Sequence, residues 1–165
     1  KTIVSASKAQ ELLFWLMGFI GVPSYGSLGC AVFLVACGSG VLLFDAGRLN
    51  LLALGDESAE HLGVDVRTLE RRTLLASSLV IGSIVSLTGL IGFVGLIVPH
   101  ALRRIVGPDA RLLAPLSLLL GASVLVLCDL ASRAAFSLLH AELPVGALTA
   151  LLGGPLFLLL LRKRV

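Results

Sequence analysis

Long runs of apolar residues, separated by short polar stretches, dominate the chain. Four of them, residues 26–44, 73–99, 112–128 and 143–161, contain no Asp, Glu, Lys or Arg. A helix needs about 20 residues to cross the roughly 30 Å of hydrocarbon in a bilayer. The pattern therefore predicts a chain of membrane-spanning helices.

The second run, residues 73–99, is too long for one ordinary crossing. Its second half, TGLIGFVGLIVPH, contains four residues that favour a break: Gly89, Gly92, Gly95 and Pro99. Such a cluster is tolerated at membrane depth when protein surrounds it. The alternative to one crossing is a turn between two, residues 73–90 and 93–106.

The distribution of Lys and Arg decides between these topologies. A single crossing divides the 13 basic residues 5 to 8, whereas a turn places all of them except Lys1, Lys8 and Arg133 on one side. Cytoplasmic loops carry an excess of Lys and Arg, so we expect the turn. The short second arm is acceptable if protein encloses it.

The expected fold class is therefore all-α, a polytopic membrane helix bundle. Its five segments are residues 26–44, 73–90, 93–106, 112–132 and 143–161. The N-terminus faces outward and the C-terminus lies in the cytoplasm. Residues 45–72 and 103–111 are cytoplasmic, and residues 1–25 and about 130–144 face outward. A short amphipathic helix is expected at residues 8–18, before the first span.

Composition supports this picture. Hydrophobic residues make up 57% of the chain and charged residues only 14%, against about 25% charged in soluble domains. The net charge of +3 follows from the basic cytoplasmic side, so we expect no nucleic-acid groove. The basic end, Arg162-Lys163-Arg164, is suited to contact with lipid headgroups.

Candidate chemistry is sparse. The three cysteines lie inside apolar runs, where small buried side chains are the expectation, and His61, His100 and His140 fall on different segments. The spacing predicts no metal site, and no phosphate loop of the form GxxxxGK[ST] occurs, so no cofactor is expected. An intramembrane enzyme would use Asp129, Glu142 and His100, but the topology places His100 on the opposite side from the other two.

The polar stretch LNLLALGDESAEHLG, residues 49–63, looks too structured for a simple connector. It predicts two short helices, the first ended by Gly55 and the second running from near Asp56 to Gly63. Acidic residues in the first turn favour that second helix, and Ala59 lets another surface approach. The loop either fits a groove in a partner protein or folds back on its own bundle.

These residues also carry a family resemblance. LNLLALGDESAEHLGV resembles the cytoplasmic coupling loop of the iron-siderophore, haem and cobalamin permeases of ABC importers, the FecCD-type permeases, and ESAEHLG resembles the importer signature EAA-x-x-x-G. Three further motifs follow in the family's order: GLIGFVGLIVPHALRRIVGPDAR at 89–111, DLASR at 129–133 and AELPVGALTALLGGPLFLLLLRK at 141–163.

The resemblance implies a type II ABC importer permease in a bacterial plasma (inner) membrane. Such permeases look like ten-helix subunits that pair as homodimers or pseudo-dimers, so this chain, which begins at Lys1, is expected to be a fragment matching segments six to ten. The implied partners are a second permease subunit, a cytoplasmic ABC ATPase, an extracytoplasmic binding protein and membrane lipid. The alternative is a truncated nonfunctional remnant or a membrane scaffold.

The resemblance also assigns roles to residues. The ATPase would grip the loop at Leu54, Gly55, Glu57, Ala59 and Gly63. The binding protein would dock on Arg133, although Asp129, four residues earlier, is equally placed to pair with it. Gate and helix-break positions are implied at Gly92, Gly95, Pro99, Pro144, Gly154 and Pro155; for the last two, close packing through small residues is the alternative.

Overall fold

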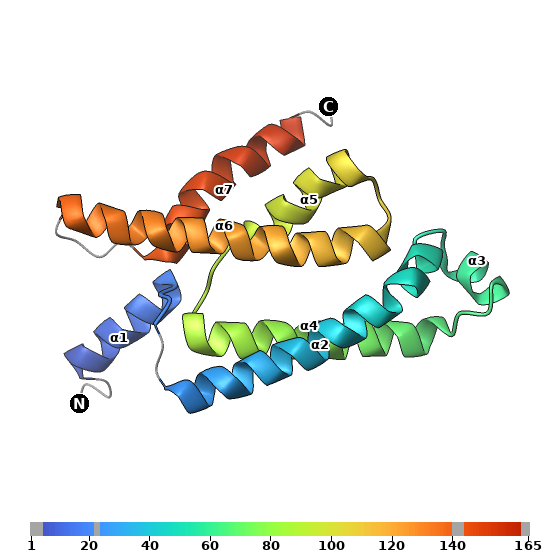
Figure 1. Ribbon diagram of the computed structural model, residues 1–165, viewed down its shortest axis with the longest axis horizontal. Helices are drawn as coiled ribbons and strands as arrows, with labels where there is room; N and C mark the ends of the chain where they lie inside the picture. The colour runs from blue at the N-terminus through green and yellow to red at the C-terminus, as the bar shows by residue number, and fades with distance from the viewer. Residues whose placement is uncertain (1–4, 22–23, 140–143, 163–165) are drawn as a thin grey trace. The chain divides into compact units, whose positions relative to one another are not determined.

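The computed structural model describes residues 5–21, 24–139 and 144–162, and every regular element in those ranges is a helix. In chain order the helices are α1 (Ala6–Met17), α2 (Tyr25–Leu52), α3 (Asp56–His61), α4 (Val66–Thr88), α5 (Val94–Val106), α6 (Ala110–Leu139) and α7 (Val145–Arg162) (Figure 1). The all-α fold expected from the sequence is confirmed, and α1 matches the short helix expected before the first span.

The long apolar run is interrupted at the place where the turn is expected. Helix α4 ends at Thr88 and α5 begins at Val94. Gly89 at the start of the connection has φ +68°, and Phe93 at its end has φ +67°. Side chains are rarely tolerated in this left-handed region, so the chain turns where glycine permits it.

At four of the gate or helix-break positions the helices continue. Gly95 and Pro99 lie inside α5, and Gly154 and Pro155 lie inside α7. A proline removes one backbone hydrogen bond, but neighbouring elements in membrane proteins re-satisfy the freed group without ending the helix. Gly92 does lie in the connection between α4 and α5, and Pro144 directly precedes α7.

The first of the two short loop helices is also absent as a separate element. Helix α2 continues through that segment to Leu52. It begins at Ser24, whose hydroxyl accepts a hydrogen bond from the backbone N–H of Ser27, a typical N-cap. Its 28 residues span roughly 42 Å at 1.5 Å per residue, so α2 is longer than a hydrocarbon core and extends beyond it.

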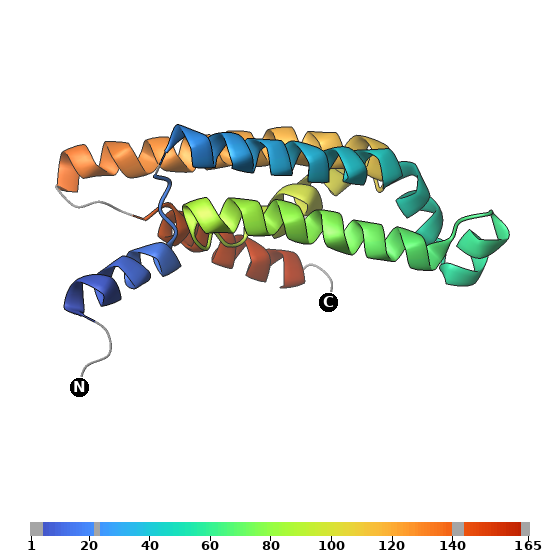
Figure 2. The ribbon, with the colours of Figure 1, turned by 90° about the horizontal axis from the view of Figure 1, so that it is seen from below.

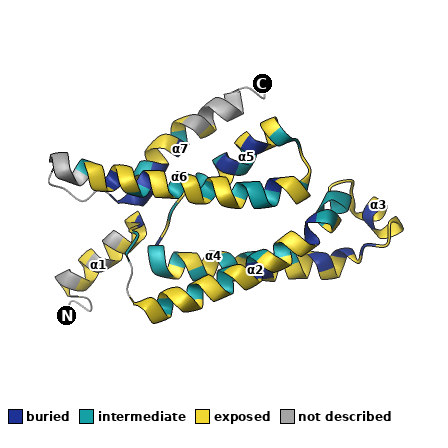
Figure 3. Cartoon of the chain, in the orientation of Figure 1, coloured by how far each residue is buried: buried dark blue, intermediate teal, exposed yellow. Residues whose placement is uncertain are grey.

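Two helices in the described residues are long and apolar enough to cross a membrane by length and composition, Tyr25–Leu52 and Ala110–Ala135. Only 6% and 11% of their most apolar windows are buried within the chain, and Figure 3 shows exposed residues along most of both helices. Cys128 is buried as expected, whereas Cys30 and Cys37 on α2 are exposed.

The chain forms two compact units. One contains α1, Val85–Val98 and the chain from Leu120 onward, and the other contains Pro23–Ile84 and Pro99–Leu119. In the second unit α2 and α4 run side by side with α3 at one end (Figure 2). A side chain at Gly38 of α2 would meet Ala76 and Val80 of α4, so the missing Cβ permits this close approach.

Candidate functional site

Helix α3 is held between two glycines whose backbone conformation other residues rarely adopt. Gly55 before it has φ +107° and Gly63 after it has φ +83°. Nothing lies within 4 Å of a Cβ built at either position, so the backbone angle, not space, is what requires glycine there. Asp56 and Glu57 occupy the first turn, and His61 the last, the arrangement that the helix macrodipole favours.

A small apolar cluster anchors α3 to the rest of its unit. Its buried members are Ala59, Val64, Val66 and Leu69, and Leu49, Leu51 and Leu52 at the end of α2 pack against it. Ala59 is completely buried, and its carbonyl accepts hydrogen bonds from the backbone N–H groups of Leu62 and Val64. Helix α3 therefore packs on its unit through Ala59 while its other residues stay exposed.

The exposed face of the loop combines apolar and acidic side chains. Leu54 is 66% exposed and Leu62 58% exposed, and Glu57 and Glu60 are exposed as well. Folding back on its own helices is therefore seen for Ala59, and the groove in a partner protein stays a prediction for the exposed side chains. Gly55, Glu57 and Leu54 lie on the exposed surface, whereas Ala59 lies beneath it.

Asp65 caps the N-terminus of α4. Its carboxylate accepts hydrogen bonds from the backbone N–H of Thr68 at 3.1 Å and from the Thr68 hydroxyl at 2.7 Å. These two bonds hold the pKa of Asp65 below its usual range, with smaller contributions from Arg67 and Arg72. The cap fixes where α4 begins and therefore how the loop enters it.

A second link joins the end of α2 to the turn between α5 and α6. The Asn50 amide donates to Asp109 Oδ1 at 2.6 Å, and the Asn50 side-chain oxygen accepts from the backbone N–H of Ala110 at 2.7 Å. The hydrogen bonds from Asn50 and from the Arg111 backbone lower the pKa of Asp109. Sequence reasoning missed this contact, because no local signal relates residues 50 and 109.

Asp45 is buried one turn before the loop. It is 1% exposed, and Arg48 Nη1 donates to its Oδ1 at 2.9 Å. The Arg48 guanidinium also lies 5.7 Å from the centre of the Phe44 ring. Because an unpaired buried carboxylate is costly, Arg48 is needed to keep Asp45 in place.

On the side predicted to face outward, Arg133 is already paired. Its Nε donates to Asp129 Oδ2 at 2.8 Å, and the Arg133 side chain remains 68% exposed. The i, i+4 pair expected from the sequence is confirmed. The guanidinium retains further N–H groups that a partner could contact. Glu142 lies outside the described residues.

Three glycines form a backbone junction in the other unit. A Cβ on Gly18 at the end of α1 would strike the Leu90 carbonyl, and one on Gly146 in α7 would strike the carbonyls of Met17 and Leu90. The Gly146 N–H donates to the Gly18 carbonyl at 3.2 Å. Gly89 likewise faces a carbonyl of α1. The sequence predicted a turn at Gly89, but no local pattern indicated that the three glycines meet.

Packing against α7 explains one of its two adjacent glycines. A Cβ on Gly153 would overlap the Phe93 side chain, whereas Gly154 has open space around it. The alternative of close packing through small residues therefore describes Gly153.

Within the described residues, His100 Nε2 in α5 and Ser117 Oγ in α6 are buried without a hydrogen-bond partner. Across the described ranges, no group of three His, Cys, Asp or Glu side chains is placed to hold a metal ion.

Comparison with known proteins gives consistent matches. The chain is 45% identical over 160 residues to a cobalamin import system permease protein of Halobacterium salinarum, which covers 97% of this chain and 42% of the relative. It is 44% identical over 156 residues to a hemin transport system permease protein of Yersinia pestis, covering 94% of this chain and 46% of the relative. A molybdate import system permease protein of Haemophilus influenzae is 37% identical over 156 residues, covering 94% and 45%.

A solved structure shares the fold. It is described as an inward-facing conformation of an ABC transporter of proposed metal-chelate type, and it matches with a TM-score of 0.87 and 36% identity over 97% of this chain and 51% of its own. The chain thus spans about half the length of the proteins it matches. A model of the FecCD transport family matches residues 1–163, so the chain belongs to that family.

Proposed function

We propose that this chain supplies part of the transmembrane permease subunit of an ABC importer in a bacterial plasma membrane. A separate ATPase subunit would drive transport, and the permease itself would carry out no covalent chemistry. Residues 45–72 would form the cytoplasmic loop, and the ATPase would contact it at α3 and at the flanking residues Leu54, Gly55 and Gly63. Family membership and the permease names of the relatives support this assignment.

The observation that carries the proposal is the construction of α3. A helix of six residues is too short to be stable alone, yet it is fixed by two glycines and a buried alanine beyond the ends of two long helices. The surface that remains is apolar and acidic, with Leu54 and Leu62 exposed. Such a rigid projecting helix fits a groove in a partner protein, and the partner proposed is the ATPase.

Charge reversal on this surface tests the assignment. Glu57→Lys should weaken binding of the purified ATPase of the same transport system about tenfold, roughly 1.4 kcal/mol, because it replaces an acid at the contact. Glu70→Lys is the matched control, since Glu70 is exposed on α4 outside the proposed contact. Binding is measured by interferometry with the permease in detergent. Equal ATPase binding by the unmodified permease and both variants would refute the contact. Absence of ATPase binding by the unmodified permease would favour the remnant or scaffold alternative.

The remaining partners are proposed on the same basis. A second permease subunit, as a homodimer or pseudo-dimer, would complete the pathway, and an extracytoplasmic binding protein would dock on Arg133. Arginine suits that role because its guanidinium binds a carboxylate through two hydrogen bonds. The bond to Asp129 is made through Nε, so the two terminal nitrogens would be the ones that contact the partner's carboxylate.

The cargo proposed is an iron-siderophore, haem or cobalamin-type chelate. The relatives' names include cobalamin and hemin, and also molybdate, so related permeases serve cargoes of different size. Uptake of radiolabelled cobalamin, haemin and ferric siderophore by vesicles containing the complete system would distinguish these classes. Transport of molybdate alone would overturn the chelate assignment.

A further inference from the structure

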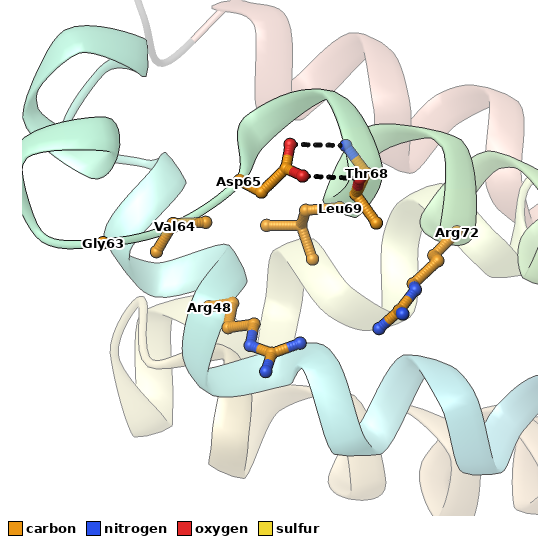
Figure 4. A pocket seen from close by; sticks show the side chains of 7 residues that line it. All are labelled: Arg48, Gly63, Val64, Asp65, Thr68, Leu69 and Arg72. Atoms are coloured by element: carbon orange, nitrogen blue, oxygen red, sulfur yellow. Dashed lines mark hydrogen bonds between the residues drawn. The ribbon is translucent and has the colours of Figure 1, made fainter.

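A cavity of about 250 Å³ opens beside the loop, between the end of α2 and the beginning of α4. It is smaller than the roughly 300–1,000 Å³ of pockets for drug-sized ligands, so it suits a compact group. The side chains that line it come from three places, the end of α2, the stretch after α3 and the first turns of α4 (Figure 4): Arg48, Gly63, Val64, Asp65, Thr68, Leu69 and Arg72.

Two guanidinium groups share this cavity. Figure 4 shows the side chains of Arg48 and Arg72 extending toward one another from α2 and α4. Arg48 is held by its ion pair with Asp45 and by the Phe44 ring, and its side chain is 51% exposed. In the part of the chain that the structure describes, Arg72 makes no hydrogen bond or ion pair within 4 Å, although its charge acts on Asp65 through space.

The one carboxylate in the lining, Asp65, makes its hydrogen bonds to Thr68 and not to either arginine. Both oxygens of Asp65 accept hydrogen bonds from Thr68, and Figure 4 shows them turned toward that residue. Arg48 is balanced by its ion pair with Asp45, and Asp65 keeps its own charge, but Arg72 and the remaining N–H groups of Arg48 still line the cavity as hydrogen-bond donors. Guanidinium groups bind phosphate and carboxylate through paired hydrogen bonds, so the cavity is built for a small oxyanion.

Exposed apolar side chains continue from the cavity along both helices. Phe44, one turn before Arg48 on α2, is 77% exposed, and Leu75, one turn after Arg72 on α4, is 69% exposed. Gly38 lies against Ala76, and the end of α2 packs on the cluster that contains Leu69, so α2 and α4 run antiparallel in this region. Both apolar positions are therefore displaced from the arginines in the same direction, away from α3.

We propose that the cavity binds the phosphate of an anionic phospholipid between Arg48 and Arg72, with an acyl chain lying along Phe44 and Leu75. An oxyanion next to an apolar surface is the chemistry of an amphiphile, and basic pockets at the cytoplasmic side of membrane helices bind such headgroups. A carboxylate on the ATPase would satisfy the arginines but would leave the apolar residues uncovered. The lipid site depends on the proposed function only in placing the ends of α2 and α4 at a membrane surface.

The test is titration of the detergent-solubilised protein with phosphatidylglycerol, read by native mass spectrometry. Arg72→Gln should weaken phosphatidylglycerol binding about tenfold, the loss of one charge-assisted hydrogen bond. Arg71→Gln removes the same charge from the neighbouring position, which does not line the cavity, and should change binding less than about twofold. Arg72 is the better target than Arg48, whose loss would leave Asp45 buried without its partner.

The competing sources of an oxyanion give different results. Phosphatidylcholine should bind about tenfold more weakly than phosphatidylglycerol, because its choline cancels the net negative charge. Equal effects of Arg71→Gln and Arg72→Gln on lipid binding would overturn the site in favour of diffuse surface attraction. Displacement of the lipid by millimolar inorganic phosphate would overturn the lipid assignment.

The lipid site and the ATPase contact are separated by their variants. Arg72→Gln should retain ATPase binding, whereas Glu57→Lys should retain phosphatidylglycerol binding. Loss of ATPase binding with unchanged lipid binding in Arg72→Gln would show that the cavity serves the ATPase instead.

Discussion

The apolar cluster beneath α3 makes a quantitative prediction for Leu69→Ala. Leu69 is 3% exposed and belongs to a cluster that joins α3 to the end of α2. Truncating a buried leucine costs about 2–5 kcal/mol, depending on how far the site collapses. This cluster is small and lies at one end of its unit, so we expect the lower part of the range, about 2–3 kcal/mol.

That loss should appear first as local opening of α3. The Val64 N–H donates to the Ala59 carbonyl at 3.0 Å, and the Leu62 N–H donates to the same carbonyl at 3.1 Å. If α3 opens as one unit, 2–3 kcal/mol corresponds to roughly 30- to 150-fold faster amide hydrogen exchange at these positions. Exchange is measured by mass spectrometry of the protein in detergent, with peptides covering residues 54–69.

Leu75→Ala is the matched control. It makes the same truncation on the same helix, but Leu75 is 69% exposed and leaves no cavity. Exchange in the loop should therefore stay within about twofold of the unmodified protein. The reasoning fails if Leu69→Ala leaves exchange unchanged, or if both variants accelerate it equally, because burial would then not be what holds α3.

Three further predictions address other parts of the chain. Gly146→Ala should lower the midpoint of thermal unfolding, because its Cβ would strike two carbonyls. Gly154→Ala in the same helix has open space around its Cβ and should stabilise α7 by up to about 1 kcal/mol. Equal unfolding midpoints for the two variants would contradict the packing. Asp65 has a lowered pKa in the folded chain, so its cap stabilises α4 above the unfolded value near 3.9 and is lost as the pH falls through the folded value. Protection at the start of α4, measured as exchange relative to the intrinsic rate at each pH, should therefore fall in acid, and it should not change with pH in Asp65→Ala. Arg133→Ala should weaken docking of the binding protein, measured by surface plasmon resonance, while Asp129→Ala, which frees the guanidinium, should not. Unchanged affinity in both variants would mean that Arg133 serves only as the local partner of Asp129.

Much of the fold was predictable because its signals are local. Charge-free runs about 20 residues long, a glycine cluster between residues 89 and 95 and the asymmetry of Lys and Arg predicted helices and one turn, and α4 and α5 meet at that turn. The prolines could not be interpreted in the same way, because Pro99 and Pro155 lie inside helices. A proline's effect depends on whether surrounding groups compensate for its missing N–H, and no local pattern records that.

The candidate loop shows the same division. The spacing of Gly55 and Gly63 around acidic residues predicted α3, because a positive φ and a favourable first turn are properties of the local chain. Which of its residues is buried could not be read locally. Ala59 faces inward because Leu69 and the end of α2 meet beneath it.

By itself, the sequence determined the helical class, the apolar segments and the turns, since hydrophobic period, charge and glycine act over a few residues. The tertiary structure alone decided which distant groups meet. It joined Asn50 to Asp109, brought Gly18 against Gly146 and directed Arg48 and Arg72 into one cavity. Each of these contacts links residues far apart in the chain or on different helices, so its energy exists only after the helices have packed.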